Sequence, residues 1–261
     1  MSADARPAHL TEAALSGLSK GLDTGMVLAA GLGSRMRPLT EHKPKPLLEV
    51  AGRSLFDRSL DRLGEVGVSR VVANLHYLPE QIREHWAAHP HSGMALAFSD
   101  ESARLLDTGG GVRAALPLLD RPAFYTINGD NVWTAPEALG PLAGAWDPAR
   151  MDALLLLVPI ERTHGYTRAG DFSVDAAGRL VRRGAAARAP LVYTGAQVLS
   201  AGAFADAPEA PFSLNLVWDR LIASGRAFGC VCAGDWVDVG TPEGLQLATD
   251  LVSHSVECST Y

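Results

Sequence analysis

Apolar and polar residues alternate along this chain of 261 residues in two distinct patterns. Short apolar runs bounded by turn residues predict buried strands, and apolar residues three or four positions apart predict amphipathic helices. In the first part of the chain the predicted strands are residues 26–30, 70–75, 94–98, 123–128 and 152–159, and the predicted helices are 54–66, 79–89, 110–116 and 136–146. This alternation of strand and helix is typical of a mostly parallel sheet covered on both faces.

The second part of the chain favours shorter strands joined by tighter turns. The predicted strands are residues 171–174, 180–183, 191–198, 227–232 and 236–239, and the predicted helices are 214–223 and 242–251. Both parts together predict an α/β fold with a Rossmann-like mixed, mostly parallel sheet flanked by helices. We expect one domain over residues 25–252, an N-terminal extension over 1–24 and a C-terminal tail over 253–261.

Composition and charge narrow the classes of function. The chain has 47% hydrophobic and 20% charged residues and a net charge of −6, which argues against a nucleic-acid or anionic-membrane partner. No apolar stretch reaches the roughly 18 residues of a membrane span, and the N-terminus has no signal-peptide pattern. The three cysteines fit neither a disulfide framework nor a zinc ribbon, so we expect reduced thiols in a cytoplasmic protein. A monomer and a small homo-oligomer both stay open.

Positive charge gathers in one stretch, VLAAGLGSRMRPLTEHKPKPLL, which includes the end of the first predicted strand. Gly31 and Gly33 let the backbone approach a ligand closely, and the N–H groups of such a loop can bind phosphate oxygens. Arg35 offers a planar guanidinium group, and Lys45, between two prolines, offers a compact charge. The stretch therefore indicates a triphosphate site, and a solvated surface loop is the alternative on composition alone.

The dinucleotide-binding and P-loop motifs do not fit this stretch. G-x-G-x-x-G would require a third glycine where Met36 stands, and the chain contains no G-x-x-x-x-G-K-[ST]. The stretch does contain L-A-A-G-x-G-x-R-x-R-P-L-T over Leu28–Thr40, followed by P-K-P over Pro44–Pro46. In these positions it resembles the sugar-1-phosphate nucleotidyltransferases. The resemblance covers about residues 25–250 and continues through residues 107–111, 128–130, 170–172 and 236–241.

The resemblance implies a glycosyltransferase-A-like nucleotidyltransferase fold and transfer of a nucleotidyl group from a nucleoside triphosphate to a sugar 1-phosphate, releasing pyrophosphate. It is greatest to a short bacterial branch that uses UTP and N-acetylmuramic acid 1-phosphate in cell-wall sugar recycling. The hexapeptide repeats of the longer branches do not occur in this chain. Glucose 1-phosphate, mannose 1-phosphate with GTP, and phosphocholine with CTP stay open as substrates. A non-catalytic nucleotide-sugar sensor on the same fold is the alternative class.

The resemblance also implies a set of site residues and one cofactor. The predicted catalytic residues are Arg35, Lys45 and Asp130; the predicted nucleotide contacts are Ala30, Gly31, Gly33, Ser34, Arg35, Lys45, Gly109 and Asn128; and the predicted sugar-phosphate contacts are Asp171 and Asn215. Asp130 and Asp238 are expected to bind Mg²⁺, a cation that prefers oxygen ligands. We also expect free N–H groups in the glycine run 109–111, at a helix start, to face a base or a phosphate.

Two further groups of residues, one of histidines and one of cysteines, are interpreted as structural. His85, His89 and His91 have a spacing that could bind zinc, but no cysteine or carboxylate obviously completes the site, so a solvated helix end is favoured. Cys230 and Cys232 lie on one side of a predicted strand, and we expect both to pack against neighbouring apolar residues.

Overall fold

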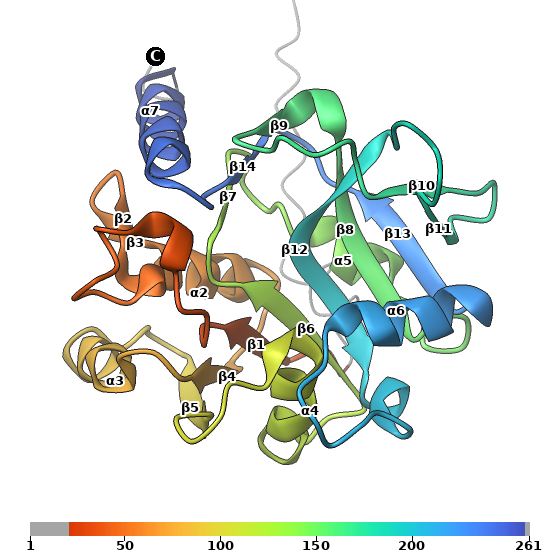
Figure 1. The fold of residues 1–261 in the computed structure, drawn as a ribbon, viewed down its shortest axis with the longest axis horizontal. Helices are drawn as coiled ribbons and strands as arrows, with labels where there is room; N and C mark the ends of the chain where they lie inside the picture. Colours follow the sequence, from red (N-terminus) through yellow and green to blue (C-terminus); the bar gives the residue numbers. More distant parts are fainter. Residues whose placement is uncertain (1–20, 259–261) are drawn as a thin grey trace, which may run out of the picture.

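A mixed sheet of nine strands forms the centre of the computed structural model, which describes residues 21–258 (Figure 1). Residues 1–20 of the predicted extension and 259–261 of the predicted tail lie outside the described residues. The nine strands are β1 (Thr24–Leu28), β4 (Arg70–Leu75), β5 (Ala95–Asp100), β6 (Ala123–Asn128), β8 (Ala153–Pro159), β10 (Phe172–Val174), β11 (Leu180–Arg182), β12 (Leu191–Ser200) and β13 (Ala227–Val231). Their order is β11-β10-β12-β6-β1-β4-β5, and β8 pairs with both β12 and β13.

Strand directions confirm the mixed, mostly parallel sheet. Strands β6, β1, β4 and β5 are parallel neighbours, whereas β12 runs antiparallel to both β6 and β8. Leu28 at the end of β1 lies opposite Asn128 at the end of β6. The loops that follow these two strands therefore meet at the carboxyl edge of the sheet, where open α/β sheets bind ligands.

Helices cover both faces of this sheet. They are α2 (Leu55–Glu65), α3 (Pro79–Ala88), α4 (Asp107–Leu119), α5 (Gly140–Ala145), α6 (Leu214–Ala223) and α7 (Pro242–Cys258), with short 3₁₀ helices η1 (Ser34–Met36), η2 (Lys45–Leu47), η3 (Ile160–Arg162) and η4 (Ala201–Phe204). Successive side chains of β8 point to opposite faces. Leu154 and Leu156 join a core cluster with α2, α3 and α5, and Leu155 and Leu157 join a second cluster with α4 and α6.

Two small sheets complete the fold beside the carboxyl edge. Strand β14 (Trp236–Asp238) pairs antiparallel with β7 (Asn131–Trp133) and parallel with β9 (Thr163–His164), and β2 (Glu49–Val50) pairs with β3 (Arg53–Ser54). A third apolar cluster, which includes Met36, Val237 and Ala248, anchors α7 and the loop after β1 to this region. The pairing of Asp238 with Asn131 places a distant part of the sequence next to the end of β6.

The predicted strands of the large sheet are confirmed to within a few residues, but helix ends differ. The helix predicted over 136–146 is only α5, because Glu137 adopts a positive φ of 52° that interrupts a helix before Gly140. The helix predicted over 110–116 begins earlier, at Asp107, since the glycine run is itself helical. Among the described residues, no helix is long and apolar enough to cross a membrane.

Candidate active site

Two adjoining cavities open at the carboxyl edge of the sheet. The larger cavity has a volume of about 720 Å³ and the smaller about 240 Å³. Asp107, Thr108, Asn128 and Asp130 line both, so the two cavities meet at the end of β6 and the start of α4. A site of this shape can hold two ligands whose reacting groups meet at Asp130.

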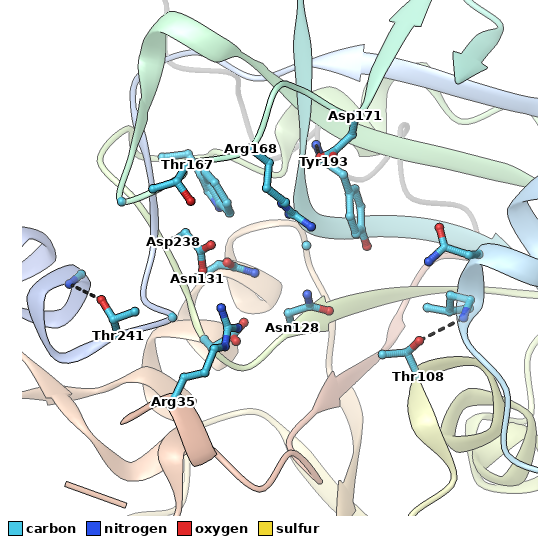
Figure 2. A pocket seen from close by; sticks show the side chains of 18 of the residues that line it. Arg35, Thr108, Asn128, Asn131, Thr167, Arg168, Asp171, Tyr193, Asp238 and Thr241 are labelled. Carbon is cyan, nitrogen blue, oxygen red and sulfur yellow. Dashed lines mark hydrogen bonds between the residues drawn. The ribbon is translucent and has the colours of Figure 1, made fainter. Parts of the chain in front are cut away.

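The loop after β1 supplies a wall to each cavity. Ala30 and Gly31 line the smaller cavity, and Arg35 reaches the larger one from η1 (Figure 2). Gly33 has a positive φ of 62°, and a Cβ there would lie only 3.0 Å from the Thr40 side chain. The Thr40 hydroxyl in turn donates to the Gly33 carbonyl at 2.8 Å. Glycine is therefore required at this turn to close the loop that presents Arg35.

Lys45 and two aspartates form the charged centre. Lys45 is only 9% exposed, and its Nζ lies 2.7 Å from Asp130 Oδ2. Pro44 and Pro46 flank this lysine, and η2 begins at Lys45 itself, so its backbone direction is restricted. Burial and the neighbouring Asp130 carboxylate raise the pKa of Asp238, while the charge of Lys45 opposes that rise. Two like charges therefore face one position at the junction of the cavities.

The donor set of this position fits a hard cation. No group of three or more His, Cys, Asp or Glu side chains suited to a metal occurs among residues 21–258. Mg²⁺ does not need such a group, because it is commonly held by one or two carboxylates with substrate phosphates and water completing its shell. Asp130 and Asp238 provide the two carboxylates, and the pKa of Asp238 is raised first by its burial and second by the charge of Asp130.

A buried carboxylate lies at the end of the smaller cavity, and sequence reasoning missed it. Glu101 is 2% exposed and forms no ion pair with any described residue. One of its oxygens accepts from Asn74 Nδ2 at 2.7 Å and the other from the backbone N–H of Leu106 at 3.0 Å. The Asn74 Oδ1 accepts from Ala29 N at 2.8 Å, which links this network to the loop after β1. Lone glutamates after a strand carry no sequence signal that would have identified this one.

Two N–H groups of the glycine run 109–111 are not free, in contrast to the expectation from the sequence. The N–H groups of Gly109 and Gly110 both donate to the Phe212 carbonyl, at 2.9 and 3.0 Å. A Cβ on Gly109 would lie 2.4 Å from the Phe212 ring, and one on Gly111 would lie 2.6 Å from Glu101 Oε1. Glycine is required in this run because α4 packs closely against the segment before α6 and against Glu101. The expectation of free N–H groups is therefore wrong for Gly109 and Gly110.

The larger cavity contains the predicted sugar-phosphate residues and several polar residues that sequence reasoning missed (Figure 2). Asp171 accepts hydrogen bonds from the Tyr166 hydroxyl and from Tyr193 N, both at 3.1 Å. Asn215 lies in the first turn of α6, where the Ser213 side chain caps the helix. Asn131 is 4% exposed and lines the cavity, and its buried Nδ2 donates to no other described residue.

Most of the predicted site residues line these cavities. Those that do are Ala30, Gly31, Arg35, Lys45, Asn128, Asp130, Asp171, Asn215 and Asp238. Gly33, Ser34 and Gly109 line neither cavity: Gly33 shapes the loop and Ser34 begins η1. Their predicted nucleotide contacts stay predictions.

The histidine cluster lies outside the cavities and is not simply a solvated helix end. His85 Nε2 lies 3.1 Å from the Asp57 carboxylate, and His91 Nε2 lies 2.7 Å from Asp61 Oδ1, so α3 and the loop after it are tied to α2. The cysteines behave as expected of packing residues. Burial raises the pKa of Cys230 to about 12 and that of Cys232 to about 11.

Comparison with known proteins identifies the family. The family described as "MobA-like NTP transferase domain" matches residues 25–201. The chain is 41% identical over 230 residues to an N-acetylmuramate alpha-1-phosphate uridylyltransferase of Caulobacter vibrioides, covering 87% of this chain and 95% of that protein. It is 33% identical to a protein of the same name from Neisseria meningitidis, covering 83% and 92%.

A solved structure agrees on the fold. The inositol-1-phosphate CTP transferase from T. maritima superposes with a TM-score of 0.74 at 19% identity, over 91% of this chain and 97% of that one. The loop after β1, the charged centre and the relatives all agree. This chain belongs to the sugar-1-phosphate nucleotidyltransferases, a family of enzymes with a MobA-like NTP transferase domain.

Proposed function

We propose that this enzyme joins UTP and N-acetylmuramic acid 1-phosphate to give the UDP-sugar and pyrophosphate. The observation that carries the chemistry is the placement of Lys45, Asp130 and Asp238 where the two cavities meet. The nucleoside occupies the smaller cavity, its phosphates extend past Asp130 to Arg35, and the sugar phosphate occupies the rest of the larger cavity. The choice of sugar is supported by the two relatives of that name, which match over most of their length.

The reaction needs positioning and charge stabilisation more than acid–base catalysis. A phosphate oxygen of the sugar 1-phosphate attacks the α-phosphorus of UTP in line, and the bond from that phosphorus to the bridging oxygen breaks, releasing pyrophosphate. The attacking phosphate is already anionic near neutral pH, so it needs no general base. Lys45 holds the α-phosphate, and Arg35 holds the departing pyrophosphate. Mg²⁺, when held by Asp130 and Asp238, supplies further neutralisation of the triphosphate charge.

Glu101 favours UTP over CTP as the nucleotide. A carboxylate only accepts hydrogen bonds, so a buried one favours a base edge that donates. Uracil donates from its N3–H, whereas the N3 of cytosine accepts and would face the carboxylate with a like lone pair. Glu101 accepts hydrogen bonds from Asn74 and Leu106 but has no ion-pair partner among the described residues, which supports a role toward a ligand. Asn128 at the end of β6 can pair with a further polar atom of the nucleoside.

The alternatives predict different substrates or no turnover. A relative from Haloferax volcanii named UTP–glucose-1-phosphate uridylyltransferase AglF is 26% identical, so glucose 1-phosphate is the second candidate sugar. The non-catalytic sensor is disfavoured because Arg35, Lys45, Asp130 and Asp238 are all present. Since N-acetylmuramic acid is a cell-wall sugar, we also propose that the enzyme acts in peptidoglycan recycling, in the cytoplasm, where UTP is available.

Pyrophosphate release tests this proposal. The full chain is incubated with UTP, CTP, GTP, ATP or dTTP and with N-acetylmuramic acid 1-phosphate, glucose 1-phosphate or mannose 1-phosphate, with Mg²⁺ or with a chelator. We expect release with UTP and N-acetylmuramic acid 1-phosphate, and loss of release with the chelator. Faster release with another pair would reassign the substrate, and release that persists in the chelator would refute the role of the metal. An Asp130→Asn variant is the matched control for contaminating phosphatase.

A further inference from the structure

One guanidinium group in the larger cavity has no hydrogen-bond or ion-pair partner among the described residues, although its positive charge opposes the rise in the pKa of Asp238. Arg35, Arg168 and Arg182 all line this cavity. Arg182 is bound to the Asp219 carboxylate, 2.7 Å from its Nη2, and lies over the Phe172 ring. Among the described residues, Arg168 forms neither a hydrogen bond nor an ion pair, and its guanidinium group lies over the face of the Tyr166 ring, 4.9 Å from the ring centre.

The surroundings of Arg168 hold it in this place. The Tyr166 hydroxyl donates to Asp171 Oδ1, so the ring beneath the guanidinium is fixed by the polar wall of the cavity. The backbone on either side is also anchored, by the pairing of β9 with β14 and by the hydrogen bond from Ala189 N to Ala169 O at 2.8 Å. Gly170 has a positive φ of 86°, and a Cβ there would lie 2.1 Å from the Ala189 carbonyl oxygen. These backbone contacts therefore fix the loop in the conformation that points Arg168 into the cavity.

Arg168 enters from the wall opposite the phosphate-binding loop. Figure 2 shows its side chain pointing into the cavity between Asp238 and Tyr193, whereas Arg35 enters from the other side. Two guanidinium groups, neither of them in an ion pair with a residue between 21 and 258, thus face one cavity from two directions. Arg35 belongs to the loop that binds phosphates in the proposed reaction, which leaves Arg168 for an anionic group elsewhere on the sugar.

N-acetylmuramic acid carries such a group. It differs from N-acetylglucosamine by a lactyl ether on the oxygen of C3, and this ether ends in a carboxylate. A carboxylate that leaves water for a protein cavity needs a charged hydrogen-bonding partner, and a guanidinium group matches its two oxygens. Resting on the proposed function, we infer that Arg168 is the specificity-determining residue that binds the lactyl carboxylate of the sugar.

The test compares two sugars that differ only in this group. Turnover is measured with saturating UTP and with N-acetylmuramic acid 1-phosphate or N-acetylglucosamine 1-phosphate, for the wild type, Arg168→Ala and Arg168→Lys. Arg168→Ala should lower the ratio of kcat/KM values for the two sugars by about 10- to 100-fold, chiefly through KM for the acidic sugar. The ratio for Arg168→Lys should lie between those of the wild type and Arg168→Ala, because lysine keeps the charge but not the forked geometry. The control is Arg183→Ala, an exposed arginine that lines neither cavity.

A binding measurement gives the same comparison without turnover. Calorimetry with the two UDP-sugars should show the same 10- to 100-fold change in the ratio of their dissociation constants for Arg168→Ala. This comparison works even where N-acetylglucosamine 1-phosphate reacts too slowly to follow. If Arg168→Ala lowered the affinity for both sugars by the same factor, Arg168 would be reassigned to the phosphates and the inference would be overturned. If the affinity for neither sugar changed, the inference would be overturned as well. Failure of the proposed function is distinguished by the wild type, which would then prefer a neutral sugar 1-phosphate before any substitution is made.

Discussion

Replacing Lys45 by methionine removes one charge at the junction of the two cavities and nearly preserves side-chain volume. The Nζ lies 2.7 Å from Asp130 Oδ2. At that distance and an effective dielectric constant of about 20, the attraction is about 6 kcal/mol before desolvation is subtracted. Loss of a preorganised charge at a transition state costs on the order of 3 kcal/mol. We therefore expect kcat of Lys45→Met to fall about a hundredfold.

The same substitution should also weaken the fold. Breaking a fully buried ion pair costs about 3–5 kcal/mol, because one charge is left without its partner. The Asp130 side chain is 32% exposed, so water can offset part of that cost and we expect about 2 kcal/mol. Urea unfolding without divalent metal measures this loss. Adding Asp130→Asn to Lys45→Met should restore most of the stability but none of the activity, since both charges are then absent.

Either of two results would refute this reasoning. If Lys45→Met kept normal turnover, Lys45 would not act on the reacting phosphates. If the double variant were no more stable than Lys45→Met, the lost stability would not arise from the unpaired Asp130 charge. Circular dichroism of each variant at the assay temperature confirms that the rates refer to folded protein.

Three other substitutions test neighbouring parts of the site. Glu101→Gln, which adds a donor, should raise turnover with CTP relative to UTP by about tenfold, whereas a purely structural role would lower both equally. Asp238→Asn should raise the unfolding temperature near neutral pH without metal, because the raised pKa of Asp238 means that its charged form is disfavoured in the folded protein. The difference in unfolding temperature should vanish when the pH falls below that pKa, because the wild-type carboxyl is then protonated. A difference that persisted at low pH would refute this explanation. Gly195→Ala should cost about 2–4 kcal/mol in urea unfolding and most activity, because Gly195 has a φ of 87° and its Cβ would lie 2.0 Å from Asn131 Nδ2; an unchanged midpoint would contradict this.

Local pattern was enough to predict the main sheet and the loop that follows its first strand. Strands such as Ala123–Asn128 are short apolar runs bounded by turn residues, so their ends could be predicted to within a few residues. Helix ends were placed less well, because they depend on single residues such as Glu137, whose positive φ has no signature in the sequence. The glycine run 109–111 shows the same limit, since its contact with Phe212 joins segments far apart in the chain.

By itself the sequence indicated a phosphate site in the loop after the first strand, and the resemblance of the motif over residues 28–46 to the sugar-1-phosphate nucleotidyltransferases implied the reaction class, because that motif lies within one short stretch. Only the tertiary structure decided which distant groups complete the site. Asp238 reaches Asp130 through the pairing of β14 with β7, and Glu101 reaches the first loop through Asn74. Such contacts depend on the packing of separate elements, so no periodicity or motif in one stretch of sequence records them. The position of the Arg168 guanidinium, which forms no hydrogen bond or ion pair with the described part of the chain, is likewise a property of the assembled cavity.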